Sequence, residues 1–362
     1  MEHDSLAVVS KSFSVPPENV CIVSSESIAC LWAGMGEIFE IRFYLNDNEK
    51  NIISMICKKI CLPANEGSIS YGDMRKKKSY EVEKCFYDRF ASILNKNDVT
   101  VPEGLYTKNS CSNLFICMTR LKGKSLSNLG IKNAKRAVKW AAKLHALTWG
   151  VRADEFVASM GLQSQGTYWY LDTRPNEFEN IPRKGWEGRL YSAARAIDER
   201  LKADPFQSII HGDFKAANMV SDGVDNFGMC DFQYCGKGCC LKDICYMIAC
   251  YCSSSNIDSE GDRVHHPFEE AIFDLYYAEL KANAAKQGLL EVPSYDALLD
   301  AADLCFVDIT RWMAGWGYWG NSFLIPRTQK ILDKIDNGTL LSSENAYRQA
   351  VQSVYTRNNL NV

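Results

Sequence analysis

The residues best suited to do chemistry lie in the sequence HGDFKAAN, residues 211–218, which follows two isoleucines. A second acidic triplet, DFQ, begins at Asp231 after the apolar run FGMC. Gly, Asp and Asn are common loop formers, so an ordinary turn explains these residue types. A phosphoryl-transfer loop explains them too. That reaction needs a carboxylate near the attacking hydroxyl, oxygen ligands for Mg²⁺ and a cation on the phosphates.

HGDFKAAN supplies these groups within one loop. Asp213 is the candidate base, and Lys215 can face the transferring phosphate. Asn218, five residues after Asp213, and Asp231 are the candidate metal ligands, since Mg²⁺ prefers one or two carboxylates plus phosphate oxygens. His211 is expected to hold the loop by hydrogen bonds rather than to titrate in catalysis.

The nucleotide phosphates need a further cation, and the first third of the chain offers two lysines. Lys58, in SMICKKI, can neutralise the α- and β-phosphates, and Glu83, in YEVEKCFY, can pair with it. Lys59 is the rival, because neighbouring side chains of a strand point to opposite faces. We prefer Lys58, although periodicity alone does not choose. The turn that carries Gly34 and Gly36 could lay backbone N–H groups over phosphates, and an ordinary hairpin explains it equally well.

The elements that must position these residues fall into two groups, which predicts an α+β fold. Strands rich in β-branched and aromatic residues are expected at 27–34, 36–45, 51–60 and 113–121, with one helix at 79–94. Beyond residue 122 the pattern is mainly helical, with helices expected at 133–149, 241–252, 267–288 and 294–316. Ser294 is the expected N-cap of the last of these. We therefore divide the chain into a nucleotide-binding lobe, 1–121, and a catalytic and acceptor-binding lobe, 122–362.

Composition limits the possible partners. A net charge of −3 with 23% charged residues offers no electrostatic reason to expect nucleic-acid binding. The basic cluster 75–78 is expected to be a solvated segment just before a helix. We find no signal peptide and no apolar run of membrane-spanning length, which predicts a soluble, cytoplasmic protein with no membrane partner. Without a secretion signal, most of the fifteen cysteines are expected to be free thiols, and the spacing of those in 235–252 argues against a zinc module.

The motifs together resemble a known group of enzymes. HGDFKAAN followed by DFQ is similar to the aminoglycoside phosphotransferase and choline kinase superfamily. Segments between residues 54 and 320 resemble, more closely, its ecdysteroid-kinase-like (CHK kinase-like) branch. They are SMICKKICLP, KSYEVEKCFY, GTYWYLDTR, HGDFKAANMV, DFQYCGKGCCLKDICY and RWMAGWGYWG.

This resemblance implies a bilobal protein-kinase-like fold, with a small β-rich N-terminal lobe, a larger helical C-terminal lobe and ATP between them. It implies that Asp213 is the catalytic base and that Asp243 supports the catalytic loop. The metal ligands would be Asn218 and Asp231, and the phosphate-orienting pair would be Lys58 and Glu83. The hinge would consist of Met118, Thr119, Arg120 and Leu121. The loop at residues 34–36 has fewer glycines than the protein-kinase pattern.

Two aromatic clusters are the candidate acceptor site. Aromatic faces can line a pocket for an apolar ring system or hold a quaternary ammonium, and ordinary core packing explains them equally well. The candidate residues are Trp169, Asp172, Arg174, Trp312, Trp316 and Trp319. The sequence thus predicts an ATP- and Mg²⁺-dependent kinase of a small hydroxyl-bearing molecule. The alternative is a catalytically silent relative that binds nucleotide or a hydrophobic ligand.

Overall fold

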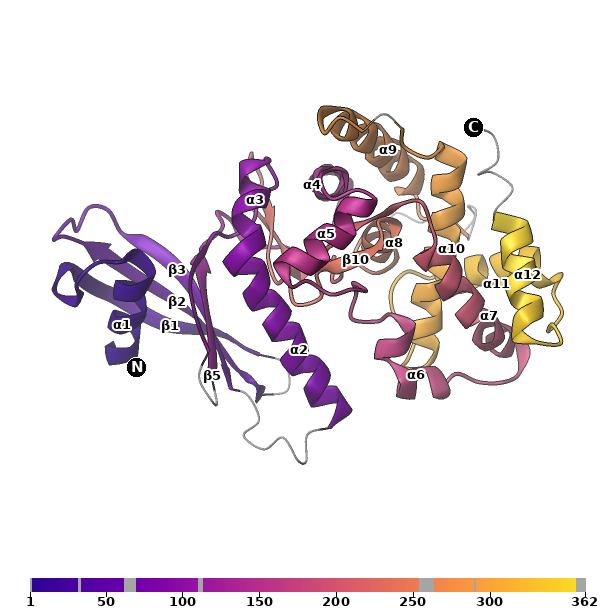
Figure 1. Cartoon of the computed structure of the whole chain (residues 1–362), viewed down its shortest axis with the longest axis horizontal. Helices are drawn as coiled ribbons and strands as arrows, with labels where there is room; N and C mark the ends of the chain where they lie inside the picture. Colours follow the sequence, from indigo (N-terminus) through magenta and orange to yellow (C-terminus); the bar gives the residue numbers. More distant parts are fainter. Residues whose placement is uncertain are drawn as a thin grey trace. The chain divides into compact units, whose positions relative to one another are not determined.

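The computed structural model describes residues 2–31, 34–61, 70–109, 113–253, 264–289 and 291–355 (Figure 1). The chain forms two compact units: residues 1–123 with 222–233, and residues 124–221 with 234–362. The division made from sequence, after residue 121, assigned no later segment to the first part. The segment 222–233, which carries DFQ, joins the first unit through long-range contacts such as Met229 N–H to Thr100 O, 3.3 Å.

The first unit is built on an antiparallel five-stranded sheet in the order β1-β2-β3-β5-β4. The five strands of this sheet are β1 (Val20–Cys30), β2 (Gly36–Leu45), β3 (Ile53–Cys61), β4 (Gly104–Asn109) and β5 (Asn113–Thr119). The short strand β9 (Phe227–Met229) lies in the same unit but outside this sheet. The helices of the unit are α1 (Glu2–Phe13), α2 (Tyr71–Cys85) and α3 (Ala91–Lys96), with a π-helical turn at Phe86–Phe90 between the last two.

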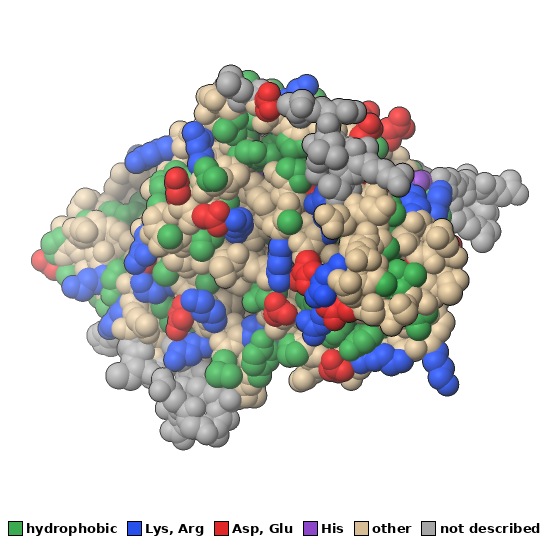
Figure 2. Space-filling view, turned by 45° about the vertical axis from the view of Figure 1, so that its right-hand side comes forward, with side chains coloured by type: hydrophobic (Ala, Val, Ile, Leu, Met, Phe, Trp, Pro, Cys, Tyr) green, Lys and Arg blue, Asp and Glu red, His purple; other side chains and the backbone are tan. Residues whose placement is uncertain are grey.

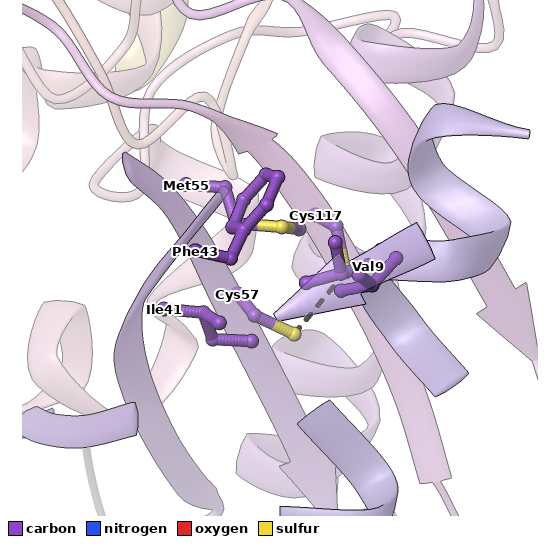
Figure 3. Close-up of a cluster of buried hydrophobic side chains, with 7 residues drawn as sticks. Val9, Ile41, Phe43, Met55, Cys57 and Cys117 are labelled. Carbon is purple, nitrogen blue, oxygen red and sulfur yellow. Dashed lines mark hydrogen bonds between the residues drawn. The ribbon is translucent and has the colours of Figure 1, made fainter. Parts of the chain in front are cut away.

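The core of the first unit lies between α1 and one face of the sheet, as Figure 3 shows. Val9 of α1 packs with Phe43 of β2, Cys57 of β3 and Cys117 of β5, and the two thiol sulfurs lie 3.2 Å apart. Because side chains alternate along a strand, burying Cys57 on this face turns the next residue, Lys58, toward the opposite face. The packing of α1 therefore decides which β3 lysine can meet α2.

The second unit is largely helical. Its helices are α4 (Ile131–Leu147), α5 (Val151–Met160), α6 (Pro175–Glu179), α7 (Gly185–Lys202), α8 (Leu241–Cys250), α9 (Glu269–Lys286), α10 (Tyr295–Ala314), α11 (Leu324–Asp336) and α12 (Glu344–Tyr355). Its strands are β6 (Lys124–Ser125), β7 (Gln207–Ile210), β8 (Met219–Ser221) and β10 (Gly236–Cys239), and β7 pairs with β10. The loop 211–218 thus begins where β7 ends and leads into β8.

Most expected elements are confirmed, with shifted ends. β2 has its expected bounds, α4, α9 and α10 match within three residues, and Ser294 caps α10 by accepting the N–H of Ala297 at 3.2 Å. β1 begins seven residues earlier than expected, and residues 32–33 lie outside the described residues. The expectation for 75–78 is wrong: this basic segment lies inside α2, because Ser70 accepts the N–H of Asp73 and starts the helix earlier.

The surface agrees with the charge balance of the sequence. Figure 2 shows Lys and Arg interspersed with Asp and Glu on the face it presents. In the part of the chain that the structure describes, no helix is both long enough and apolar enough to cross a membrane.

Candidate active site

In the first unit, Lys58 meets two carboxylates. Its Nζ lies 2.6 Å from Glu83 Oε1 on α2 and 2.9 Å from Asp231 Oδ1 in DFQ. Lys58 and Glu83 are almost completely buried, whereas 28% of the Asp231 side chain is exposed. Lys59, on the other face of β3, lies instead 6.0 Å from the centre of the Phe115 ring. The structure therefore brings Lys58 together with Glu83 and Asp231.

When Glu83 is ionised, these three residues carry one more negative charge than positive charge. Burial disfavours the Lys58 ammonium, but the charges of Asp231 and Glu83 outweigh it and raise the pKa of Lys58. Burial raises the pKa of Glu83 to about 7 despite the neighbouring ammonium. A second cation in contact with Asp231 would therefore reduce the excess negative charge of these three residues.

Backbone and ring packing hold Asp231 in place. Its φ of 68° lies in the left-handed region, which Asp tolerates better than most residues and which is often found at functional sites. The next residue, Phe232, stacks on Phe86 with ring centroids 3.7 Å apart and planes inclined by 7°. Phe86 opens the π-helical turn that follows the helix of Glu83. One stacking contact thus connects the DFQ segment to α2.

The glycines predicted to cover phosphates have different local requirements. Gly36 pairs with Ile60 of β3, and a Cβ there would lie 2.0 Å from the carbonyl oxygen of Lys59. Close approach of the two strands therefore accounts for Gly36. Gly34 has a φ of 69°, and a Cβ there would meet no atom within 4 Å, so only its backbone conformation favours glycine.

The predicted hinge lies at the end of β5. Met118 is buried and pairs with Ile56, whereas Thr119 ends the strand. Arg120 NH1 donates to Glu40 Oε1 at 2.7 Å, an ion pair near the surface. Leu121 follows, two residues before the end of the first unit at Gly123.

In the second unit, two side chains of the loop 211–218, those of Lys215 and Asn218, contact the carboxylate of Asp213. The Asp213 Oδ2 atom lies 2.7 Å from Lys215 Nζ and accepts a hydrogen bond from Asn218 Nδ2 at 3.2 Å. The same amide nitrogen donates to the Asp213 carbonyl at 3.0 Å, so the Asn218 amide oxygen is the atom suited to a cation. His211 is buried, and its Nδ1 accepts the N–H of Asp213 at 3.3 Å. Lys215 is 32% exposed.

Asp243, near the start of α8, stabilises this loop by accepting hydrogen bonds from its backbone. Its two carboxylate oxygens accept the backbone N–H groups of His211 at 2.7 Å and Gly212 at 3.0 Å. His145 of α4 was not expected at this site from the sequence. It is fully buried, its Nε2 lies 3.5 Å from Asp243 and its Nδ1 lies 2.9 Å from the Tyr276 hydroxyl. In the sequence, a histidine on the apolar face of an expected helix was the feature that could have indicated this contact with Asp243.

Gly212→Ala is expected to disrupt the loop. Gly212 has a φ of 81°, and a Cβ there would lie 2.2 Å from the carbonyl oxygen of Tyr234, which cannot move away as a side chain could. Strain of this kind costs on the order of 1–3 kcal/mol before any clash is counted. Thermal unfolding should show a lower Tm than for Gly223→Ala, which has the same backbone strain (φ 80°) but open space around its Cβ. Equal losses would contradict the proposed close approach.

The two aromatic clusters form one group in the second unit, with a buried part and a more exposed part. Trp169 and Trp312 are buried and stack with centroids 6.2 Å apart. Trp319, partly buried, contacts Trp312 edge-on at 4.6 Å. Trp316 is 58% exposed. Core packing thus accounts for Trp169 and Trp312.

The two charged acceptor candidates do not pair with each other. Asp172 lies at the surface, 3.5 Å from Lys202. Arg174 is buried, donates to the Tyr168 carbonyl at 2.8 Å and pairs with Glu177 at 3.2 Å. Its guanidinium lies 5.4 Å from the Tyr168 ring and 5.8 Å from the Trp316 ring. Arg174 therefore fixes local packing, whereas Asp172 is solvated.

The cysteines do not form a metal centre within the described residues. Those that the structure describes are free, and most members of the group at 235–252 are buried. Across the described ranges, no cluster of three or more His, Cys, Asp or Glu side chains could hold a metal ion. A thiol-based zinc module is therefore not formed there.

Comparison with known proteins assigns a family. Residues 44–280, about two thirds of the chain, match the phosphotransferase enzyme family. No protein of curated function matches the sequence. The fold is similar, at a TM-score of 0.46 and 13% identity, to an aminoglycoside phosphotransferase from Streptomyces rimosus solved with ADP and streptomycin, over 87% of this chain and 99% of that one. A macrolide 2′-phosphotransferase from Brachybacterium faecium gives 0.45 and 13%, over 86% and 97%.

Proposed function

Because the chain belongs to the phosphotransferase enzyme family, we propose that it transfers the γ-phosphate of ATP to a hydroxyl of a small organic molecule. The protein is a small-molecule phosphotransferase, an enzyme whose acceptor group is an alcohol. The observation that carries the more specific proposal is the closed loop at 211–218. It presents the Asp213 carboxylate, beside a lysine and an amide, within a rigid backbone held by Asp243.

Each residue has a proposed part in the transfer. Asp213 orients the acceptor hydroxyl and takes its proton as the oxygen attacks the γ-phosphorus. Lys215, already beside Asp213, offsets the charge of the transferring group. Lys58, held by Glu83, neutralises the phosphates that remain on the nucleotide. Met118, Thr119, Arg120 and Leu121 are proposed as the segment along which the adenine binds.

The proposed metal ligands offer donor atoms of the type that Mg²⁺ prefers. One partly exposed carboxylate, Asp231, and one amide oxygen, Asn218, match an ion that takes few protein ligands and completes its shell with phosphate oxygens and water. When bound, the ion neutralises charge that develops on the phosphate oxygens. Asp231 would exchange its contact with Lys58 for one with the cation, and Lys58 would turn to phosphate.

We also propose that the chain belongs to the ecdysteroid-kinase-like branch of the family. The aromatic segments that carry this resemblance, 166–174 and 311–320, contact each other through the stack of Trp169 on Trp312. They therefore act as one structural feature rather than two chance enrichments. Phosphorylation of a hydroxyl on an apolar ring system by the purified protein would support the branch assignment.

An ATP-consumption screen tests the proposed function. Purified protein, ATP and Mg²⁺ are incubated with a library of hydroxyl-bearing metabolites, and mass spectrometry identifies any phosphorylated product. Asp213→Asn serves as the matched control, because it retains the volume of the side chain. Nucleotide binding without transfer to any compound would favour the silent relative. Transfer by wild type and Asp213→Asn alike would contradict the role of the loop.

The aromatic cluster predicts two separable mutant effects. Trp169→Ala should lower the free energy of unfolding by about 3–5 kcal/mol, because a fully buried ring leaves a cavity. Trp316→Ala, at an exposed position, should change stability by roughly 0.5 kcal/mol or less but raise the acceptor KM more than the ATP KM. Urea unfolding and steady-state kinetics measure both effects. Unchanged KM values for Trp316→Ala would remove this residue from the acceptor site.

A further inference from the structure

We propose that the hydroxyl groups of Tyr168, Tyr246 and Tyr251 form the element that binds an uncharged oxygen of the acceptor, next to the hydroxyl that is phosphorylated. The inference rests on the proposed function and adds to it a specificity-determining set of residues. Tyr168 belongs to one of the aromatic segments expected near the acceptor, whereas Tyr246 and Tyr251 were not expected there from sequence.

The three hydroxyls form a continuous hydrogen-bonded chain within the second unit. Tyr168 Oη lies 2.7 Å from Tyr246 Oη, which lies 3.1 Å from Tyr251 Oη. Both ring pairs meet edge-to-face, at 6.1 and 5.4 Å between centroids. Tyr246 is buried on α8, whereas Tyr168 and Tyr251 at the two ends are partly exposed. The chain therefore has a buried centre, and its two ends belong to partly exposed residues.

Backbone contacts place this chain beside the catalytic loop. A Cβ on Gly212 would lie 2.7 Å from the backbone nitrogen of Thr167, so the residues before Tyr168 and before Asp213 touch. Tyr246 lies one helical turn after Asp243, whose carboxylate holds the backbone of the same loop. The electrostatics agree: burial raises the pKa of Tyr168 well above its usual value, and the charge of Asp213 raises it further.

Counting protons shows that the chain can bind something more. Each tyrosine hydroxyl has one proton to donate, so three hydroxyls have three. Two hydrogen bonds join them, and no further hydroxyl partner of these three is found among the described residues. One donated proton and the lone pairs at the ends are therefore left for a ligand or for water. An alcohol or carbonyl oxygen matches this donor and acceptor set.

The surroundings favour an uncharged ligand group. Among the described residues, the side chains that hydrogen-bond to or stack on these tyrosines carry no carboxylate. They are Tyr234, Trp312, Trp169 and Arg174, besides the tyrosines themselves. Burial also raises the pKa of Tyr246, so its hydroxyl remains a neutral donor at physiological pH. The oxygen of a hydroxyl or carbonyl would find a neutral hydrogen-bond partner here.

The test compares cyclohexanol with the 1,2-, 1,3- and 1,4-cyclohexanediols as probes. Binding to the full chain with ATP analogue and Mg²⁺ is measured by saturation-transfer NMR, and phosphate transfer is measured on the same compounds with ATP. The wild type should bind at least one diol more tightly than cyclohexanol. Each Tyr→Phe variant at 168, 246 and 251 should reduce this preference by roughly 2- to 13-fold, the value of one neutral hydrogen bond. ATP affinity should stay at the wild-type value.

Tyr347→Phe is the matched control, because it removes a buried hydroxyl that donates to Asp336 on a distant helix. It should leave the diol preference unchanged. The inference is overturned if the wild type shows no diol preference or no binding, or if the three variants keep the preference. Tyr-dependent binding without any phosphate transfer would instead contradict the proposed function while the binding element stands. Phosphate transfer to these compounds that does not depend on the three tyrosines would contradict the proposed binding element, while the proposed function stands.

Discussion

Asp213→Asn is expected to lower kcat by about 10²–10⁴-fold, the usual contribution of a positioned general base. The substitution keeps the side-chain volume and a hydrogen-bond acceptor for Asn218, but it removes the carboxylate that takes the acceptor proton. Lys215 loses its ion-pair partner but is 32% exposed, so water can solvate it and the fold should be retained. Steady-state kinetics on the acceptor found in the screen measure the loss.

Asp231→Asn is the matched variant for this experiment and should weaken metal and nucleotide binding rather than proton transfer. A charged oxygen that would face Mg²⁺ becomes a neutral one, so the metal–nucleotide complex should bind more weakly. Calorimetry with ATP, with and without Mg²⁺, should show near wild-type affinity for Asp213→Asn and a reduced Mg²⁺ effect for Asp231→Asn. Full turnover by both variants would mean that the loop at 211–218 is an ordinary turn.

Lys58→Met is expected to have the second large effect, on nucleotide affinity and on stability together. Removing one partner of a buried ion pair typically costs about 3–5 kcal/mol, because the remaining charge is left without compensation. Glu83 limits that cost, because burial already raises its pKa to about 7 and it can take up a proton once the ammonium is gone. The variant should therefore fold, with a lower Tm and weakened ATP binding.

The pH dependence of this variant has a definite sign. A carboxyl group whose pKa is higher in the folded than in the unfolded protein holds more protons when folded, so stability falls as pH rises. For Glu83 the fall should begin near the unfolded pKa of about 4.3 and continue through its raised folded pKa. Thermal unfolding between these pH values measures it. Lys59→Met is the control and should leave Tm, ATP affinity and pH dependence near wild type; the opposite ranking would assign the phosphate contact to Lys59.

Much of the fold could be predicted, because hydrophobic periodicity is a local property. The pattern of 36–45 predicted β2 residue for residue, and the long apolar faces predicted α4, α9 and α10. Elements with weak local patterns, such as β4 and α12, were missed, since their stability comes from neighbours distant in sequence. The inclusion of 222–233 in the first unit was missed for the same reason.

The sequence by itself determined the composition of the loop at 211–218. Asp213, Lys215 and Asn218 lie close together in the sequence, which favours their contact without enforcing it, and the structure shows these contacts. The tertiary structure alone decided matters that depend on which face of an element is buried. The packing of Cys57 under α1 turned Lys58 rather than Lys59 toward Glu83. Stacking across the second unit buried Trp169 and left Trp316 exposed.

The tyrosine hydroxyl chain is the furthest from anything a local pattern could predict. Tyr168 and Tyr246 are 78 residues apart, and nothing in the local pattern of either segment indicates that their hydroxyls meet. Their hydroxyls meet where Gly212 allows the backbone near Thr167 to approach the loop 211–218 and where Asp243 connects α8 to that loop. Local sequence determines which chemical groups the chain carries. The close approach of distant backbones determines which of those groups can act together.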